Sequence, residues 1–219
     1  MAVVVEVAIH RSTDWGDAEV NLAALILAAG ASSRMGSPKA LLRLGGETFA
    51  GHLVRVFKEV GCSPVILVLG HEADEIRAAL PPVEGVTVAV NPDYGRGQLS
   101  SLQSGLAALT GNLDGFLFTP VDHPAVRPST VARIVECFES HSGEMLVIPR
   151  MDGRGGHPVC CPIKLVQEFV ELAAGGKASD VVRRHCDSTA FVDVEDPGIH
   201  MDVDDPEGYR RIMEVPLLP

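Results

Sequence analysis

The sequence predicts an α/β fold, a three-layer α/β/α sandwich around a mostly parallel, mixed sheet. Continuous apolar runs alternate with amphipathic stretches along most of the 219 residues. Runs such as "VILVL" (65–69) contain no polar residue, which is typical of strands buried on both faces of a sheet. Strands that alternate with helices favour parallel pairing through helical crossovers. A composition of 46% hydrophobic and 21% charged residues is that of a globular protein.

The first half of the chain supplies three strand–helix pairs. "LAALILAAG" is a buried strand by its apolar content, and "TFAGHLVRVFKEVGC" has the apolar spacing of an amphipathic helix that Gly61 ends. The next two pairs repeat this order. The expected elements are a strand at 22–30 and a helix at 48–62, a strand at 64–70 and a helix at 71–80, and a strand at 86–92 and a helix at 99–110.

The second half continues the alternation and adds a pair of strands. "RPSTVARIVECFES" opens with Pro128 and Ser129, which are typical of a helix start. "EMLVIPR" and "HPVCCP" are expected to pair around a glycine-rich turn. The expected elements are strands at 115–122, 144–150, 157–162 and 189–195, and helices at 127–140, 163–173, 178–186 and 206–215.

Length and charge restrict the domain organisation and the class of function. We expect residues 1–21 to be an N-terminal extension and residues 22–219 to form one domain. A net charge of −11 disfavours nucleic-acid binding, and no apolar run is long enough for a membrane helix. The five cysteines include no CxxC pair and give no metal or redox motif, and their odd number favours a cytoplasmic location. They are Cys62, Cys137, Cys160, Cys161 and Cys186.

The segment "LILAAGASSRMGSPKALL" (25–42) carries the first functional signal. After the strand, Gly30 permits a tight turn, and the backbone N–H groups of residues 30–36 can converge on an anion. Arg34 and Lys39 add two cations suited to a polyphosphate. The spacing is neither that of a P-loop nor that of GxGxxG. An ordinary strand–helix loop with solvated cations fits the segment as well.

Carboxylates occur at two places where a metal ligand could lie. Asp122 comes directly after the apolar run "GFLFTPV" (115–121), at the carboxyl edge of the sheet, although a turn or helix-capping aspartate fits there too. In "DVDD", Asp202 and Asp204 lie on one side if the segment is extended, and Asp205 fits a helix cap. Magnesium prefers carboxylate oxygens together with waters.

Five blocks in one order give this chain a family resemblance. They are "LAAGASSRMGSPKALL" (27–42), "GRGQLSSLQSGL" (95–106), "TPVDHP" (119–124), "GGHPV" (155–159) and "HMDVDDPEGY" (200–209). This set is similar to that of the MobA-like nucleotidyltransferases, which have the nucleotide-diphospho-sugar-transferase, Rossmann-like fold. Within that family the chain most resembles the molybdopterin cytidylyltransferases. The resemblance implies Mg²⁺-dependent transfer of CMP from CTP to the phosphate of molybdopterin, with Mn²⁺ as an alternative metal.

The resemblance also implies roles for individual residues. Asp122 and Asp202 match the family's metal ligands, with Asp204 as the second choice for the latter position. Ala29 favours cytidine, because the guanylyl relatives more often have glycine there. Gln98-Leu99 departs from the Gly-Met pair of many relatives. The implied catalytic residues are Arg34, Lys39 and Asp122; the implied nucleotide-binding residues are Ala28, Ala29, Gly30, Arg34, Lys39, Gly70, Ser101 and Gly105; the implied acceptor-binding residues are Gln98, His123 and His157.

Several readings stay open. His157 is also consistent with a hairpin histidine, and His123 with a residue that only lines its loop. The nucleotide could be GTP, or the acceptor another phosphorylated compound. A dinucleotide-dependent oxidoreductase on the same fold is disfavoured because GxGxxG is absent. A non-catalytic cofactor-binding protein is disfavoured because the Asp122 and Asp202 carboxylates are both present. A molybdenum hydroxylase or its maturation factor is the partner that the family implies.

Overall fold

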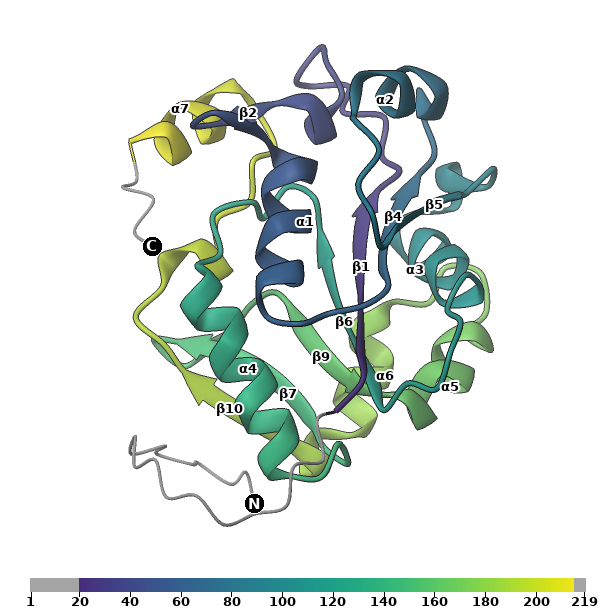
Figure 1. Ribbon diagram of the computed structural model, residues 1–219, viewed down its shortest axis with the longest axis vertical. Helices are drawn as coiled ribbons and strands as arrows, with labels where there is room; N and C mark the ends of the chain where they lie inside the picture. Colours follow the sequence, from purple (N-terminus) through teal and green to yellow (C-terminus); the bar gives the residue numbers. More distant parts are fainter. Residues whose placement is uncertain (1–19, 215–219) are drawn as a thin grey trace.

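A mixed sheet lies at the centre of the structure, a computed structural model that describes residues 20–214. Its strands are β1 (Leu22–Ala28), β4 (Val65–Leu69), β5 (Val86–Val90), β6 (Gly115–Pro120), β7 (Leu146–Met151), β8 (Arg154–Gly155), β9 (Val159–Pro162) and β10 (Thr189–Asp193). The order is β10-β7-β9-β6-β1-β4-β5, with β8 paired to β7 (Figure 1). Along this path every pair is parallel except those of β9, which runs antiparallel to β6 and β7.

Helices cover both faces of this sheet, which confirms the predicted three-layer sandwich (Figure 1). On one face lie α1 (Phe49–Glu59) and α4 (Pro128–Ser140); on the other lie α3 (Gln98–Ala107), α5 (Val166–Val170) and α6 (Ala178–Arg184). Shorter elements complete the chain: α2 (Ala73–Ala79), α7 (Pro206–Met213), a hairpin of β2 (Arg43–Leu44) and β3 (Glu47–Thr48), and the 3-10 turns η1 (Lys39–Leu41), η2 (Tyr94–Arg96), η3 (Ile163–Leu165), η4 (Cys186–Ser188) and η5 (Pro197–Ile199).

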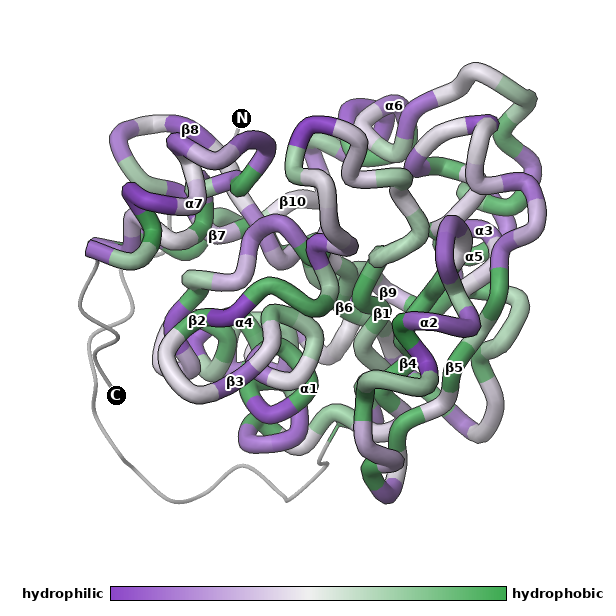
Figure 2. Tube along the Cα trace, turned by 90° about the horizontal axis from the view of Figure 1, so that it is seen from above, coloured by the Kyte–Doolittle hydropathy of each residue, from purple (hydrophilic) through white to green (hydrophobic). Residues whose placement is uncertain are grey.

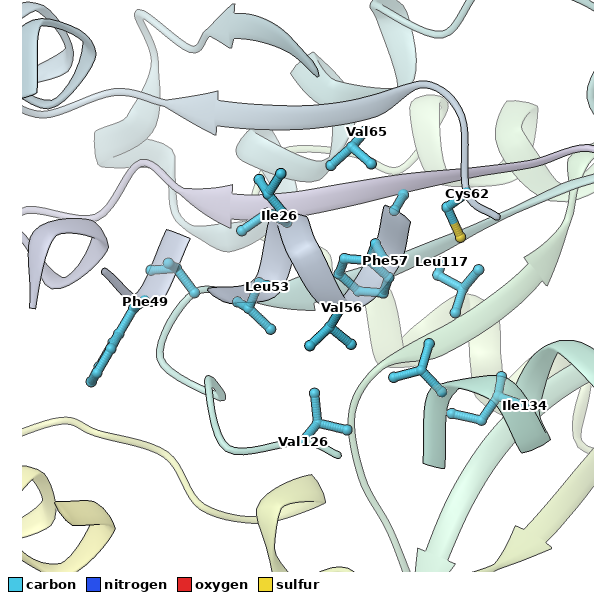
Figure 3. Packing of buried hydrophobic residues seen from close by; sticks show 14 of the residues in the cluster. Ile26, Phe49, Leu53, Val56, Phe57, Cys62, Val65, Leu117, Val126 and Ile134 are labelled. Atoms are coloured by element: carbon cyan, nitrogen blue, oxygen red, sulfur yellow. The ribbon is translucent and has the colours of Figure 1, made fainter. Parts of the chain in front are cut away.

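The central strand β1 explains why there are two cores. All seven of its residues are buried, and successive side chains point to opposite faces. Ile26 packs with Leu53 and Phe57 of α1 (Figure 3), whereas Leu25 belongs to the cluster on the other face with Phe169 of α5. In Figure 2 the trace is hydrophobic around β1 and β4 and hydrophilic at outer elements such as α2. The continuous apolar runs of the sequence are therefore strands buried on both sides.

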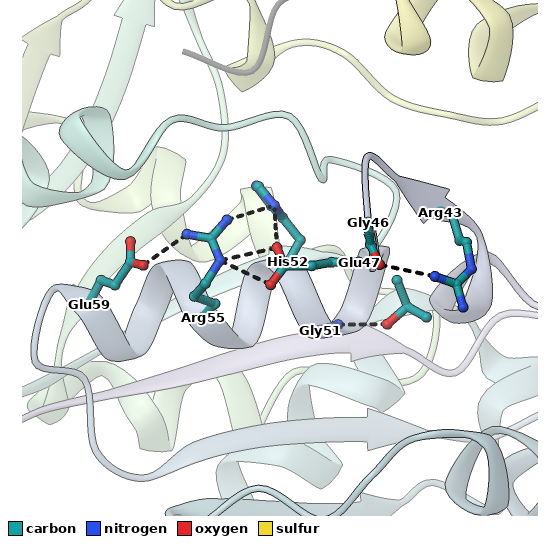
Figure 4. Close-up of polar contacts among 8 residues, drawn as sticks. Arg43, Gly46, Glu47, Gly51, His52, Arg55 and Glu59 are labelled. Carbon is teal, nitrogen blue, oxygen red and sulfur yellow. Dashed lines mark hydrogen bonds and ion pairs between the residues drawn. The ribbon is translucent and has the colours of Figure 1, made fainter. Parts of the chain in front are cut away.

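The β2–β3 hairpin and the start of α1 are joined by polar contacts that the sequence analysis did not predict. The Thr48 hydroxyl accepts a hydrogen bond from the Gly51 N–H at 3.0 Å and caps α1. Arg55 Nε donates to both oxygens of Glu47 at 3.1 Å (Figure 4). Burial and the nearby Arg55 charge hold the pKa of His52 below its usual value. Strands of two residues are too short to show an alternation of apolar and polar residues, so the sequence did not predict the β2–β3 hairpin.

β7 and β9 pair antiparallel around the glycine-rich turn, as predicted, through one register pair, Val147 with Cys160. The longer partner of β9 was not predicted. It is β6, and the two strands pair from Gly115 opposite Pro162 to Phe118 opposite Val159. The glycine-rich turn is closed by β8, which pairs with the end of β7. Because β9 inserts between β7 and β6, its backbone groups are divided between two neighbours.

A buried aspartate fixes the chain that leads to the last helix. Asp196 is 2% exposed, and its Oδ2 accepts hydrogen bonds from the Arg127 N–H at 2.9 Å and the Thr130 hydroxyl at 2.7 Å. Its Oδ1 accepts from the Gly198 N–H at 3.0 Å. A Cβ at Gly198 would lie 2.1 Å from the Ala125 carbonyl oxygen, so the two segments touch backbone to backbone. This contact holds the 196–205 segment against the start of α4.

We expect Asp196→Ala to lower the free energy of unfolding by about 2 kcal/mol, because three buried donors lose a charged acceptor. Urea denaturation measures the change. Asp205→Ala is the comparison variant, since Asp205 caps α7 with a 2.8 Å bond from the Gly208 N–H at the surface. Loss of this cap is expected to cost about 1 kcal/mol. Equal costs for both variants would contradict the role given to Asp196.

Two sequence expectations concern the ends of the chain. Residues 1–19 of the expected extension lie outside the described residues, and Asn21 is tied to Asp114, whose Oδ2 accepts a 2.8 Å bond from the Asn21 N–H. The single domain at 22–219 stays a prediction. Between residues 20 and 214, no helix has the length and apolar content needed to cross a membrane.

Candidate functional site

A cavity of about 270 Å³ opens at the carboxyl ends of β1 and β6. It is lined by the loop after β1, by the loop after β6, by the loop between β5 and α3, and by Asp204 from the segment before α7. β1 lies between β4 and β6 and is parallel to both. The chain continues from β1 to β4 and β5 on one side and then crosses to β6 on the other side, so the strand order reverses at β1. Ligands of open α/β sheets bind at such a position.

The loop after β1 has a conformation that presents backbone N–H groups. Ser32 and Gly36 have φ values of 49° and 68°, in the left-handed region. The Ser32 carbonyl accepts from the Met35 N–H at 2.8 Å, and its hydroxyl accepts from the Lys39 N–H at 3.1 Å. No acceptor in the described chain takes the other N–H groups of residues 30–36. Such a loop can bind an anion.

Opposite charges meet directly at the mouth of this loop. Lys39 Nζ lies 3.0 Å from Asp122 Oδ2 and 2.6 Å from Asp204 Oδ1. Arg34 Nη2 contacts the other oxygen of Asp204 at 3.0 Å. The Lys39 side chain is 14% exposed and that of Asp122 is 23% exposed, so these two are shielded from water. One ammonium therefore lies between two carboxylates that come from segments more than 80 residues apart.

These contacts shift the pKa values of the partners in opposite directions. Burial lowers the pKa of Lys39, but the hydrogen bond to Asp204 and the charge of Asp122 more than offset it, and the net shift is upward. The Lys39 hydrogen bond holds the pKa of Asp204 below its usual value. At neutral pH the Lys39 ammonium and the Asp204 carboxylate are thus charged. A charged cluster of this kind suits a polyphosphate that arrives with a divalent cation.

Of the two carboxylates predicted in the closing block, the structure brings Asp204 to the cavity. Val203 N–H donates to the Asp122 carbonyl at 2.9 Å, which places this segment beside the end of β6. Asp204 lines the cavity, whereas Asp202 is exposed and is not among its lining residues. The charge of Asp202 acts instead on His123. The preference for Asp202 as a metal ligand stays a prediction, and the geometry favours Asp204.

The two histidines predicted on the acceptor side form a pair next to the cavity. The rings of His123 and His157 lie 4.8 Å apart, and Phe118 stands edge-on to His157 at 6.0 Å. Both Nδ1 atoms are buried without a hydrogen-bond partner among the described residues. The pair lies outside the residues that line the cavity, on the β9 side of Asp122. Burial lowers the pKa of both rings, that of His157 to about 4.

The depressed pKa of His157 predicts an acid-sensitive fold. The unfolded chain binds a proton at His157 near pH 6.5, whereas the folded chain does so only near pH 4. This contribution to stability is therefore complete above pH 6.5 and is lost as the pH falls toward 4, by roughly 3 kcal/mol. Urea denaturation between pH 7 and 4 measures it. His157→Gln should flatten this dependence, and an unchanged slope in that variant would contradict the assignment.

The remaining predicted residues separate into two groups. Ala28, Ala29, Gly30, Gln98 and Ser101 line the cavity, and their binding roles stay predictions. Two glycines instead permit close packing. A Cβ at Gly105 would lie 2.8 Å from Leu25 Cδ2, which places this glycine between α3 and the sheet, and a Cβ at Gly70 would lie 2.7 Å from Tyr94 Cβ. Their roles in nucleotide binding stay predictions.

Sequence reasoning missed two residues of the site. Tyr94 lines the cavity, and Asn91 is buried at 2% exposure beneath the loop that carries it. The signal was present in "NPDYGRG" (91–97), where asparagine, proline and glycines mark a structured loop directly after a strand. An aromatic residue in such a loop, at the carboxyl edge of the sheet, was the available clue.

Known proteins match this chain over most of its length. The family pattern described as the MobA-like NTP transferase domain matches residues 24–189. Nicotine blue oxidoreductase from Paenarthrobacter nicotinovorans is 30% identical over 198 residues, which cover 86% of this chain and 95% of that protein. A probable molybdenum cofactor guanylyltransferase from Opitutus terrae is 40% identical over 106 residues, covering 48% of this chain and 50% of that protein.

The chain spans about a quarter of the length of the bifunctional protein GlmU from Corynebacterium aurimucosum, with 34% identity over 132 residues that cover 57% of this chain and 26% of GlmU.

Solved structures share the whole architecture. Rv0371c from Mycobacterium tuberculosis superposes with a TM-score of 0.75 at 27% identity and covers 90% of this chain and 100% of its own. The same protein in complex with manganese gives a TM-score of 0.71 at 26% identity, with the same shares. A nucleotidyl transferase from Methanothermobacter gives 0.75 at 26%, over 89% of this chain and 96% of its own. The family pattern and the fold agree, and the chain belongs to the MobA-like NTP transferase family.

Proposed function

We propose that this protein is a nucleotidyltransferase that transfers CMP from CTP to the phosphate of molybdopterin, with release of pyrophosphate. The observation that carries the proposal is the contact of Lys39 with Asp122 and Asp204 at the mouth of the loop after β1. Two cations and two carboxylates at the carboxyl edge of the sheet suit a triphosphate that binds with a divalent cation.

In this proposal the chain's own residues position the phosphates. The N–H groups of the 30–36 loop and the charges of Arg34 and Lys39 bind the β- and γ-phosphates and hold the pyrophosphate as it leaves. An oxygen of the acceptor phosphate attacks the α-phosphorus in line, and the bond to pyrophosphate breaks. No protein nucleophile is needed, because positioning of the substrates and neutralisation of charge accelerate the reaction.

The residues also fit a divalent cation. Among residues 20–214, no three histidine, cysteine or carboxylate side chains gather into a metal site. Asp122 and Asp204 nevertheless direct one oxygen each toward the same Lys39 ammonium, and magnesium commonly uses one or two carboxylates together with substrate phosphates and waters. A bound Mg²⁺ would neutralise charge that develops at the α-phosphate. The manganese complex of Rv0371c supports a divalent metal in this chain, with Mn²⁺ as the alternative.

The acceptor and the choice of nucleotide are assigned to different residues. We assign Gln98, His123 and His157 to the acceptor; the two histidines lie on the β9 side, and their buried unpartnered Nδ1 atoms could take hydrogen bonds from a polar ligand. Cytidine is proposed from Ala29, where guanylyl relatives more often have glycine. GTP, or another phosphorylated acceptor, is the alternative within the same reaction class. A molybdenum hydroxylase or its maturation factor would receive the product.

One observation favours a second function. The match to nicotine blue oxidoreductase covers more of this chain than the match to the guanylyltransferase. A dinucleotide-dependent oxidoreductase would bind its dinucleotide in the same cavity. The charged cluster of Lys39, Asp122 and Asp204 argues for the transferase, because hydride transfer from a dinucleotide requires no pair of carboxylates.

Titration calorimetry with CTP, GTP and NAD, each with and without Mg²⁺, tests the proposal. We expect CTP to bind in a Mg²⁺-dependent manner and more tightly than GTP, and we expect no binding of NAD. Pyrophosphate release with CTP and molybdopterin then checks the reaction. Preference for GTP would keep the reaction class and reject cytidine. Binding of NAD alone would reject the transferase.

A further inference from the structure

The cavity has one charged end and one uncharged end. Its four charged lining residues are Arg34, Lys39, Asp122 and Asp204, and they are connected to one another by ion pairs. The other lining residues of the described chain are uncharged and include Ala29, Ile76 and Tyr94. Ile76 belongs to α2, which follows β4, and Tyr94 follows β5, so the uncharged end lies toward the β4–β5 margin of the sheet. A ligand with an anionic end and a flat, less polar end fits this division.

Tyr94 is the aromatic residue of this end, and it is partly exposed where it lines the cavity. Of its residue surface 36% is exposed, in a protein where most large apolar side chains are buried. The His71 ring meets the Tyr94 ring edge-on, with 5.7 Å between centroids, and limits its movement on one side. A Cβ at Gly70 would lie 2.7 Å from Tyr94 Cβ and 2.8 Å from Ala29 Cβ, so all three residues meet closely. An exposed aromatic ring held from behind suits stacking by a planar group.

The loop that carries Tyr94 is fixed from below. The buried Asn91 Nδ2 donates to the hydroxyls of Ser100 and Ser101 at 2.9 and 3.1 Å, and its Oδ1 accepts from the Asp93 N–H at 2.9 Å. The Ser100 hydroxyl in turn donates to the carbonyls of Asp93 and Gly97, at 3.1 and 2.8 Å. These bonds span both sides of Tyr94 and tie its loop to the start of α3. The ring is therefore held in place before any ligand arrives, which reduces the entropy lost on binding.

We propose that Tyr94 is the platform for the nucleobase and sets the size of the base that the site accepts. The proposal rests on the nucleotidyl-transfer function above and adds its specificity residue. With phosphates at the Arg34–Lys39 end, the base extends toward the β4–β5 margin, where Ala29 and Tyr94 meet across Gly70. A single pyrimidine ring stacks there within a cavity of about 270 Å³, and the larger purine ring is disfavoured by the fixed Tyr94 wall.

The test compares Tyr94→Ala with Tyr94→Phe in the full chain, by titration calorimetry with CTP, GTP and pyrophosphate in the presence of Mg²⁺. Pyrophosphate probes the charged end alone. Tyr94→Ala should weaken CTP binding about tenfold, because a stacking face is lost, and should lower the CTP-to-GTP affinity ratio by a similar factor. Tyr94→Phe keeps the ring and should behave as the wild type. Pyrophosphate affinity should be equal in all three proteins.

The outcomes separate the base platform from the reaction itself. An unchanged CTP-to-GTP ratio in Tyr94→Ala would overturn the role of Tyr94, whereas transfer activity could stand. An equal loss for CTP, GTP and pyrophosphate would also overturn it, because the substitution would then act on the whole site. A wild-type preference for GTP would reject cytidine and would also overturn the exclusion of purines by Tyr94. If neither nucleotide binds more tightly than pyrophosphate, the platform and the proposed function both fail.

Discussion

Asp122→Asn should reduce turnover about 10⁴-fold, the largest effect expected of any single substitution in this protein. The substitution keeps the shape of the side chain and removes its charge, so the divalent cation that we propose would lose a ligand where it would neutralise the α-phosphate. A 10⁴-fold loss corresponds to about 5 kcal/mol of transition-state stabilisation. Pyrophosphate release with CTP, molybdopterin and Mg²⁺ measures it.

Two aspartates serve as matched comparisons for Asp122. Asp204→Asn should reduce turnover about 100-fold, because Asp204 contacts the same Lys39 ammonium. Asp202→Asn removes an equal charge from an exposed side chain outside the cavity and should change turnover less than about fivefold. If Asp202→Asn is instead the more damaging of these two, the family's usual ligand position holds here and our preference for Asp204 is wrong. Normal turnover in Asp122→Asn would reject the metal assignment as a whole.

Lys39→Met should weaken CTP binding about 10³-fold, or about 4 kcal/mol, because a largely buried ammonium no longer meets the phosphates. Methionine keeps most of the apolar stem, so the loss reports on the charge. Titration calorimetry with CTP and Mg²⁺ measures the affinity. Lys58→Met is the control, since Lys58 Nζ bonds the Glu84 carbonyl far from the cavity and its removal should leave the affinity unchanged.

The same variant has a second, independent readout. In the wild type, the Lys39 ammonium neutralises Asp122 and Asp204 in the absence of nucleotide. Lys39→Met leaves these two carboxylates without that cation, so Mn²⁺ added alone should bind at least about tenfold more tightly, as electron paramagnetic resonance would detect. Weaker binding of Mn²⁺ in this variant would mean that the two carboxylates do not share one cation site.

Local sequence was sufficient for the layers of the fold. The runs at β1, β4 and β6 are almost continuously apolar, which predicts strands buried on both faces of the sheet. The apolar residues of α1 and α4 have the spacing of helices with one apolar side. The position of the site at the carboxyl ends of these strands followed from the alternation alone. The pairing of β9 with β6 was not predictable in this way, because the residues of a strand with antiparallel neighbours on both sides do not show which neighbour it pairs with more.

For the site, the sequence by itself determined which residue types are present, namely the glycine-containing loop, Arg34, Lys39 and Asp122. Only the tertiary structure showed that Asp204, and not Asp202, lines the cavity beside Asp122, since two aspartates separated by one residue have the same local pattern. The Val203 N–H donates to the Asp122 carbonyl and so holds this segment beside the end of β6. Tyr94 and its Asn91 support were likewise decided by the fold. Their contacts join two loops and a helix, and such contacts depend on where the sheet brings separate segments together.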